Sequence, residues 1–421
     1  MLTNRREIMP QVFLTYLPAK QFKTCLLSAY LVAPLKKETA SYNALLPAVL
    51  RRGTMRCPNM ESLSAELDKL YGAQIDNVVR KKGERQCIGF VANAIDDAYT
   101  PHGEKLLEPL CRNLGELFLD PLTHNGRFLA EYVESEKQNL IDAIRAIRND
   151  KRDWADVRLM QEMCAAEPYG VLRLGDEASV KKINNQKLYQ HYQNLLAQSR
   201  MEIIYCGSAE EKRVERALQA AFAALPRGKV MPCPPILQYD APAEPAIITE
   251  EMDVQQGKLA MGWRCSSTDV PAMIMANLLF GGTSNAKLFL NVREKMSLCY
   301  YASSSFVRSK GIMTVSSGIE VKDYDTAVQE ILRQWEMVKE GKWEDWEWDG
   351  AMATILSGLD SLPDSQGAME NFYLGQVVTG QDSTSEELAE MLRQVTAERV
   401  RSAACMTKLD TVYFLRGKEE T

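Results

Sequence analysis

Histidine is scarce in this chain of 421 residues, with only His102, His124 and His191. No two of them share a helical turn, and none has a carboxylate or thiol three or four residues further on. Protein zinc sites draw on such closely spaced ligands. The histidine content therefore predicts no metal site built within this chain.

Other absences narrow the class of protein. The ten cysteines include no Cys-x-x-Cys pair, and most lie in apolar runs, where a free thiol behaves as a small hydrophobic group. The net charge of −6 lacks the basic footprint of a nucleic-acid binder. No apolar run approaches the ~20 residues that span a bilayer, and the N-terminus has no signal-peptide pattern. These features predict a cytoplasmic protein that contacts neither nucleic acid nor membrane.

Length and composition fit a globular protein of two or three domains. Hydrophobic residues make up 46% of the chain and charged residues 25%. The most proline-rich stretch runs from residue 226 to 245, and proline favours an extended connector. We therefore predict an N-terminal unit at 1–225, a linker at 226–245 and a C-terminal unit at 246–421.

The two halves repeat one order of elements. Each has a strand, an apolar run ending in Gly-Thr, a helix and a hairpin, and the hairpin turns Val79–Gly83 and Val307–Gly311 share four of five letters. The offset is 228 residues at the turn and 229 at the Gly-Thr. This agreement predicts an internal repeat, with Gly83 and Gly311 at turn positions that prefer positive φ. The other paired segments are Phe22–Leu35 with Lys258–Cys265, Ala44–Leu50 with Met273–Phe280, and Met60–Leu70 with Ser284–Lys295.

Amphipathic helices follow the hairpin in both halves. Lys105–Phe118 and Asp325–Val338 each place apolar residues on one face, and the longer segments Phe128–Arg148 and Trp348–Leu362 come next. The predicted fold class is α+β, with two homologous units that each pack helices on one face of an antiparallel sheet.

This arrangement resembles the pitrilysin/insulinase-type zinc metallopeptidases, the inverzincins, over nearly the whole chain. In that family a helix that ends shortly before Gly-Thr carries His-x-x-Glu-His, where two histidines bind zinc and the glutamate is the general base. The resemblance implies a metallopeptidase-like fold of the LuxS and processing-peptidase type. It also implies a peptide as the substrate.

The metal-site residues of the family are missing here. Counting back from Gly53-Thr54, the motif reads Ala44-Leu45-Leu46-Pro47-Ala48, and Pro47 is expected to kink or shorten the helix. The second helix retains Glu136, but alanine occupies its ligand position, and the adjacent Asp142 points ~100° away. The resemblance therefore implies no cofactor in this chain, with zinc only in a partner subunit. The four positions that lack metal-site side chains are Ala44, Pro47, Ala48 and Ala143.

The second half keeps a different family motif. Phe289–Tyr300 resembles Leu-Phe-x-x-(Leu/Val)-Arg-Glu-x-x-x-Leu-x-Tyr of the C-terminal unit. In active members that arginine and tyrosine position the peptide and stabilise the oxyanion at the zinc site of the other unit. The resemblance assigns this accessory role to Arg293 and Tyr300, with Phe289 lining the peptide pocket. The alternative is that Arg293 forms a salt bridge on its helix and Tyr300 packs in the sheet.

Two further segments have open interpretations. The stretch Gly72–Val79 matches the edge strand on which the family binds peptide, but it lacks the usual pattern, and an ordinary edge strand guarded by Arg80–Lys82 fits equally. The tryptophans of Trp343–Trp348 favour a helix start over a partner surface.

We therefore predict a non-catalytic subunit that supplies Arg293 and Tyr300 to a peptidase site shared with a zinc-bearing homologue. The rival prediction is a scaffold or peptide-binding homodimer without hydrolysis, which has no need of this pair. A stand-alone zinc peptidase would require His102, His124 or His191 to converge, and their spacing does not indicate this.

Overall fold

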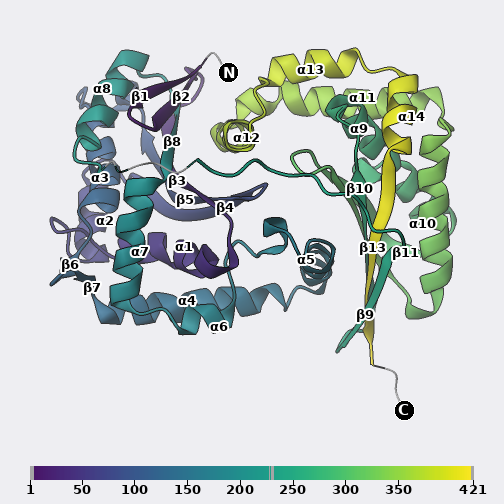
Figure 1. Cartoon of the computed structure of the whole chain (residues 1–421). Coiled ribbons are helices and arrows are strands. Elements are labelled where there is room, and N and C mark those ends of the chain that lie inside the picture. The colour runs from purple at the N-terminus through teal and green to yellow at the C-terminus, as the bar shows by residue number, and fades with distance from the viewer. Residues whose placement is uncertain (1–3, 227, 229–231, 419–421) are drawn as a thin grey trace. The chain divides into compact units, whose positions relative to one another are not determined.

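The chain forms two compact units, and neither is continuous in sequence. The computed structural model describes residues 4–226, 228 and 232–418 (Figure 1). Each half of the sequence gives one segment to the unit built mainly by the other half. Unit 1 comprises Met1–Arg145, Val171–Pro235 and Pro363–Asp382, and unit 2 comprises Ala146–Gly170, Ile236–Leu362 and Ser383–Thr421.

Unit 1 contains a six-stranded sheet in the order β1-β2-β8-β3-β5-β4. Its centre is β3, whose near-continuous apolar run is buried from Cys25 to Ala33, as expected of a strand covered on both faces. The strands are β1 (Arg5–Met9), β2 (Val12–Pro18), β3 (Thr24–Pro34), β4 (Gln74–Lys82), β5 (Arg85–Ile95) and β8 (Arg200–Gly207), with a separate hairpin of β6 (Thr123–His124) and β7 (Arg127–Phe128).

The helices of unit 1 bury their apolar faces against this sheet. Leu110, Leu114 and Leu117 of α3 are 0% exposed, which confirms the amphipathic helix predicted there. The helices are α1 (Lys37–Leu50), α2 (Met60–Asp68), α3 (Leu107–Leu119), α4 (Ala130–Ile147), α6 (Glu177–Lys181), α7 (Asn185–Gln198), α8 (Glu211–Ala221), α12 (Gln366–Thr379) and the short η1 (Asp97–Tyr99) and η6 (Leu362–Asp364), of which α4 and η6 run across the unit boundary.

Unit 2 contains a five-stranded sheet in the order β11-β12-β10-β13-β9. Figure 1 shows α10 and α14 along one face of this sheet, where Phe280 lies between Trp263 and Trp335 at ring-centroid distances of 6.1 and 4.8 Å. The strands are β9 (Ala246–Met252), β10 (Gly257–Cys265), β11 (Cys299–Val307), β12 (Ile312–Ile319) and β13 (Thr407–Gly417).

The helices of unit 2 follow the predicted order with one difference. The helix predicted at Ser284–Lys295 begins later, at Leu288, and has the wider turns of a π-helix. The helices are α5 (Lys151–Met163), α9 (Val270–Asn277), α10 (Tyr324–Lys339), α11 (Asp345–Asp360), α13 (Ser385–Arg393), α14 (Ala397–Cys405), the π-helices η3 (Leu278–Gly282) and η4 (Leu288–Lys295), and the short η2 (Pro168–Gly170) and η5 (Val321–Asp323).

The two sheets have the same topology. The order β2-β8-β3-β5-β4 of unit 1 corresponds to β9-β13-β10-β12-β11 of unit 2. In each sheet the first of these pairs is parallel and the others are antiparallel. The predicted α+β class with two similar units is confirmed, although each sheet includes one parallel pair. That the halves arose as an internal repeat stays a prediction.

The hairpin glycines adopt the predicted backbone. Gly83 has a φ of 56° between β4 and β5, and Gly311 has a φ of 60° between β11 and β12. A β-carbon at Gly311 would also come within 2.5 Å of the Cys265 carbonyl oxygen. Both positions therefore favour glycine for its positive φ, and the second also for lack of space.

Each sheet carries one helix from the other half of the chain on the face opposite its main core. In β3, Leu27, Ala29 and Leu31 face the main core, so the alternating Tyr30 points to the other face, where its hydroxyl donates to Glu370 of α12 at 3.0 Å. In β10, Ala260 packs with Leu159 of α5.

Three simpler predictions concern the linker, the cysteines and membrane-spanning helices. Residues 232–245 contain neither helix nor strand. Residues 227 and 229–231 of the predicted linker lie outside the described residues, and its role as a connector stays a prediction. All ten cysteines are free thiols, and most are buried, which confirms their role as small hydrophobic groups. Among the described residues, no helix is both long and apolar enough to cross a membrane.

Candidate functional site

The helix that resembles the metal-binding helix of the family is α1, and its motif positions are apolar. Ala44 and Pro47 are buried and Ala48 is half-buried. Pro47 lies inside the helix, which nevertheless continues to Leu50, so the predicted shortening at Pro47 is wrong. The burial of its neighbours holds the helix together despite the missing backbone donor. None of these side chains has an atom that binds zinc.

The second metal-binding segment of the family corresponds to α4. Glu136 forms an ion pair with Arg52, with Oε1 and Nε 2.8 Å apart, and its Oε2 accepts a hydrogen bond from Asn139 at 3.0 Å. Ala143 is exposed, and the adjacent Asp142 accepts from Gln138 at 2.9 Å. Glu136 therefore ties α4 to the residues that follow α1.

The three histidines are dispersed in the chain, at an exposed loop, at β6 and on α7. His102 and His124 are exposed, while His191 is half-buried and contacts Asn43. Within the described ranges, no group of three or more His, Cys, Asp or Glu side chains is placed to hold a metal ion. That the chain takes no metal stays a prediction.

The predicted accessory residues lie on η4 and at the start of β11. Phe289 and Arg293 are four residues apart on η4, and the Arg293 guanidinium carbon lies 4.6 Å from the centre of the Phe289 ring. This distance is within the range of a cation–π contact. Arg293 also pairs loosely with its neighbour Glu294, with Nε and Oε1 3.6 Å apart. The structure thus brings Arg293 and Phe289 together.

Tyr300 stands at a bulge in the edge strand β11. The register of β11 against β12 shifts between Cys299 and Tyr301, so Tyr300 has no partner residue on β12. Its side chain is 69% exposed. Tyr300 therefore does not pack in the sheet, contrary to the structural alternative considered for it. Nothing in the sequence pattern of this segment indicated the bulge.

Buried polar contacts hold the segment that carries Arg293. The Lys287 ammonium, 3% exposed, pairs with Glu347 of α11 at 3.0 Å. Asn291 donates to Gln334 of α10 at 3.0 Å. Ser297, with a φ of 53°, follows η4, and its N–H donates to the Arg293 carbonyl at 3.1 Å. These contacts fix the backbone of η4 and leave the Arg293 side chain at the surface.

The predicted edge strand is β4, which terminates the sheet of unit 1. Its basic residues do not face solvent as guards. Arg80 pairs with Glu370 of α12, and Lys82 donates to Asn371 Oδ1 at 2.7 Å. Peptide binding along Gly72–Val79 stays a prediction.

The tryptophan-rich segment begins α11, as predicted. Glu344 and Glu347 form a reciprocal capping box at the first turn, and the rings of Trp343 and Trp348 stack at 5.9 Å. Trp346 remains 52% exposed.

A half-buried carboxyl, that of Asp156, lies near Ser316 of β12 and Tyr301 of β11. Burial raises the pKa of Asp156 on α5 to about 6, against hydrogen bonding from Ser316 and the charge of Arg152. The neighbouring Tyr301 lies under the Arg152 guanidinium, 4.2 Å from ring centre to guanidinium carbon. This carboxyl is therefore ionised near neutral pH at a cost to stability.

Replacing Asp156 with asparagine is expected to stabilise the protein only at higher pH. Because the folded pKa lies above the ordinary value, the stabilising contribution of the protonated carboxyl is lost as the pH rises through about 6. Asparagine removes this loss, so the free energy of unfolding should rise by about 2–3 kcal/mol near pH ~8 and stay unchanged near pH ~4. Urea unfolding at the two pH values measures the difference, and an equal effect at both would contradict the shift.

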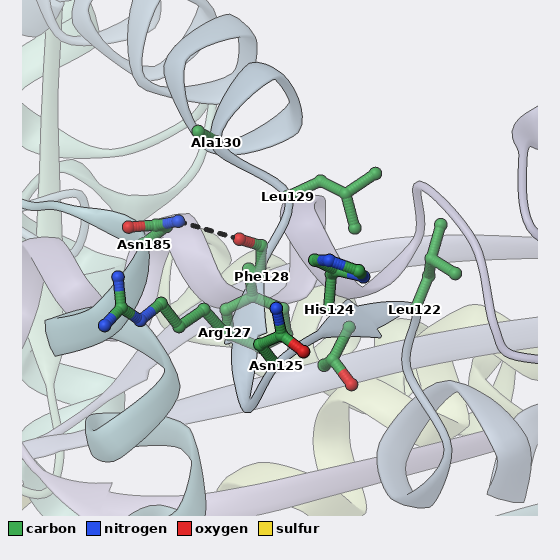
Figure 2. A pocket seen from close by; sticks show the side chains of 9 residues that line it. Leu122, His124, Asn125, Arg127, Phe128, Leu129, Ala130 and Asn185 are labelled. Atoms are coloured by element: carbon green, nitrogen blue, oxygen red, sulfur yellow. Dashed lines mark hydrogen bonds between the residues drawn. The ribbon is translucent and has the colours of Figure 1, made fainter.

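A pocket lies in unit 1 at the β6–β7 hairpin. Figure 2 shows it, with a volume of about 690 Å³ lined by His124, Arg127 and Asn185 among others. Asn185 donates to the Phe128 carbonyl at 3.0 Å, which anchors the hairpin to α7. Its charged side chains are exposed, and no predicted site residue lines it.

The comparisons with known proteins agree with these observations. The family model described as Peptidase M16 inactive domain matches residues 182–355. The chain is 34% identical over 404 residues to "Probable inactive metalloprotease YmfF" of Bacillus subtilis, covering 95% of this chain and 94% of that protein. The chain is an inactive member of the M16 peptidase family. This confirms the family predicted from the sequence.

Two further comparisons are informative. The chain is 21% identical over 328 residues to "Uncharacterized zinc protease YmxG" of the same bacterium, covering 75% of this chain and 78% of that one. The crystal structure of a conserved protein from Enterococcus faecalis superposes with a TM-score of 0.91 at 26% identity over 100% of both chains. The M16 chain therefore shares its whole fold with a solved protein.

Proposed function

We propose that this M16 chain is a non-catalytic subunit that supplies Arg293 and Tyr300 to a peptidase site on a zinc-bearing homologue, with Phe289 lining the peptide pocket. It would hold no zinc itself, because alanine and proline occupy the positions of the metal ligands and base. The observation that carries the proposal is the exposure of Tyr300, which projects from a strand bulge at 69% exposure.

The chemistry of the pair suits such a role. A guanidinium and a phenol both donate hydrogen bonds, and donors aimed at a developing oxyanion are among the larger contributions to peptide hydrolysis. The Phe289 ring holds the Arg293 guanidinium on one side, which reduces the conformations the arginine loses on binding. Neither residue replaces the metal-bound water or the general base, so both depend on a zinc site elsewhere.

A zinc-bearing partner has a counterpart among the relatives. One bacterium, Bacillus subtilis, has both the inactive relative and a relative named as a zinc protease. A homologue that keeps the metal ligands is thus the kind of partner this surface fits, and a peptide is the substrate. The alternative of a scaffold or peptide-binding homodimer is an outcome of the same experiment.

The test compares peptide cleavage by the purified chain, by a zinc-bearing homologue from the same organism, and by their mixture. Only the mixture should show full activity. Arg293→Ala or Tyr300→Phe should lower kcat of the mixture by about 100-fold, the scale for loss of one oxyanion donor, with association unchanged. Arg333→Ala is the matched control, because Arg333 is exposed and pairs within its own helix with Glu330.

Two results would overturn the proposal. Chelator-sensitive cleavage by the chain alone would show a metal site of its own. Absence of both cleavage and association with the homologue would favour the scaffold, and analytical ultracentrifugation of the chain alone would then report whether it forms a homodimer.

A further inference from the structure

Behind the degenerate motif, Asn43 and Gln86 form a buried chain of amide hydrogen bonds in unit 1. Asn43 is 1% exposed and Gln86 is 0% exposed. The Gln86 Nε2 group donates to the main-chain carbonyls of Ala40 at 3.1 Å and Arg173 at 2.7 Å. Asn43 Nδ2 donates to Gln86 Oε1 at 2.8 Å, and Asn43 Oδ1 lies 2.7 Å from His191 Nε2.

These contacts determine which ring nitrogen of His191 carries the proton. Carbonyl oxygens only accept, so Gln86 turns its NH₂ to the main chain and its oxygen to Asn43. Asn43 then presents its own oxygen to His191, whose Nε2 must donate. Burial lowers the pKa of His191 to about 4, so the ring is neutral near neutral pH and Nδ1 carries a lone pair. No donor reaches Nδ1 from the part of the chain that the structure describes.

His191 lines a pocket of about 290 Å³ between α1 and α7. The helices contact each other, and each presents one face to the pocket at helical spacing. The end of β3 and two prolines of the connector also line it. Its walls combine apolar groups with neutral polar ones, and among the described lining residues the one charged side chain, Lys36, is exposed. The residues with polar side chains that argue for a site are Lys36 just before α1, Thr39 and Asn43 on α1, and His191, Asn194 and Gln198 on α7.

We propose that this pocket binds a ring-sized apolar group that carries one O–H or N–H donor, such as a phenol or an indole, with the donor bonded to His191 Nδ1. The volume lies at the lower end of about 300–1,000 Å³ for ligand pockets, which suits a single ring and excludes an extended peptide. A neutral imidazole acceptor disfavours an anion at this point, because it has no proton to donate from Nδ1. The Asn43–Gln86 chain holds the acceptor in place without the ligand, so little ordering is required on binding.

The first test records the imidazole ¹⁵N resonances of the full chain by NMR, with p-cresol and toluene as matched probes. The free protein should show His191 as the Nε2–H tautomer. Adding p-cresol should shift the His191 Nδ1 resonance with a Kd on the order of 1 mM, as expected for so small a ligand. Toluene, which lacks the donor, should bind at least about 10-fold more weakly.

Matched variants test the location. Asn194→Trp places a large ring at the pocket rim and should abolish the p-cresol shift. Gln193→Trp, at the neighbouring exposed position of α7 that does not line the pocket, should leave it unchanged. Neither variant touches the buried amide chain, so folding is preserved in both.

A second pair of probes separates the sources of such a group. N-acetyltyrosinamide binding with a shift like that of p-cresol, and N-acetylphenylalaninamide failing to bind, would identify a tyrosine side chain of a peptide. Binding of p-cresol alone would identify a free small molecule. A His191 ring protonated at Nδ1 in the free protein, equal binding of toluene, or no shift with p-cresol up to about 10 mM would each overturn the proposal. None of these results depends on Arg293 or on a partner subunit.

Discussion

Replacing Glu167 with alanine is expected to lower the free energy of unfolding of unit 2 by about 3–5 kcal/mol. Glu167 follows α5, in the segment that the first half of the chain contributes to unit 2. It pairs with Arg264 of β10 and lies 3.0 Å from the Lys310 ammonium, while Arg264 pairs with Asp410 at 2.7 Å. The substitution leaves two buried cations with one carboxylate.

The size of this effect follows from burial. Arg264 and Asp410 are each 5% exposed, Glu167 is 7% exposed and Lys310 is 1% exposed, so water cannot take the place of the lost partner. An uncompensated buried charge is far more costly than the loss of an exposed pair. Glu162→Ala, on the preceding helix α5, is the matched control, because Glu162 pairs with Arg158 and its side chain is 33% exposed. We expect that control to cost less than about 1 kcal/mol.

Hydrogen exchange measured by mass spectrometry distinguishes the units. In Glu167→Ala, amides of α5, β10 and β12 should lose protection, while those of β3 and β5 in unit 1 should keep theirs. If amide protection falls no more in Glu167→Ala than in Glu162→Ala, the four charged side chains do not hold α5 against its sheet.

The corresponding substitution in unit 1, Glu370→Ala, is expected to cost about 2–4 kcal/mol. Glu370 is 0% exposed on α12, accepts a hydrogen bond from the Tyr30 hydroxyl at 3.0 Å and pairs with Arg80 of β4. The expected cost is smaller than for Glu167, because the Arg80 side chain is 25% exposed and can turn to water. The Tyr30 hydroxyl cannot turn to water, so it stays without a hydrogen-bond partner.

Tyr30→Phe separates the two contributions. It removes the hydroxyl together with its need for a partner, so it should cost only about 1 kcal/mol. The readout is again local exchange, here of α12, β3 and β4. If Glu370→Ala and Tyr30→Phe lower the free energy of unfolding equally, the ion pair with Arg80 contributes nothing. Charge would then not hold α12 against the sheet.

The substitutions at Glu167 and Glu370 test the same arrangement, which occurs in both units. Each sheet binds a helix from the other half of the chain, and in each case a basic residue in or next to the hairpin holds a buried glutamate. Arg80 does so for α12, and Lys310 does so for the segment after α5. The hairpin residues that the two halves share thus lie where each sheet contacts the segment contributed by the other half of the chain. A half of the chain expressed alone lacks that segment.

Much of the fold could be predicted from the sequence. Periodicity gave the amphipathic helices, because a helix that buries one face shows its apolar residues at a spacing of 3.6. The positive φ of Gly83 and Gly311 followed from turn chemistry. The inactive character followed from Ala44, Pro47 and Ala48, since alanine and proline have no group that binds a metal under any fold.

Parts of the candidate site could be placed only by the structure. The motif indicated Arg293 and Tyr300, but the exposure of Tyr300 depends on a bulge that arises from how β11 pairs with β12. The pocket at His191 was not anticipated, because Asn43 and His191 are 148 residues apart and single side chains give no periodic signal. The histidine's acceptor nitrogen is known only from the chain of contacts that ends at two main-chain carbonyls.

By itself the sequence determined the order of elements, the fold class, the family and the loss of the metal ligands, because these depend on local periodicity and on the identity of single residues. The tertiary structure alone determined the exchange of α5 and α12 between the two units and the partners of Glu167 and Glu370. An apolar face on a helix requires burial but does not specify which sheet covers it. That choice rests on contacts such as Tyr30 with Glu370, which are 340 residues apart and form only when the whole chain has folded.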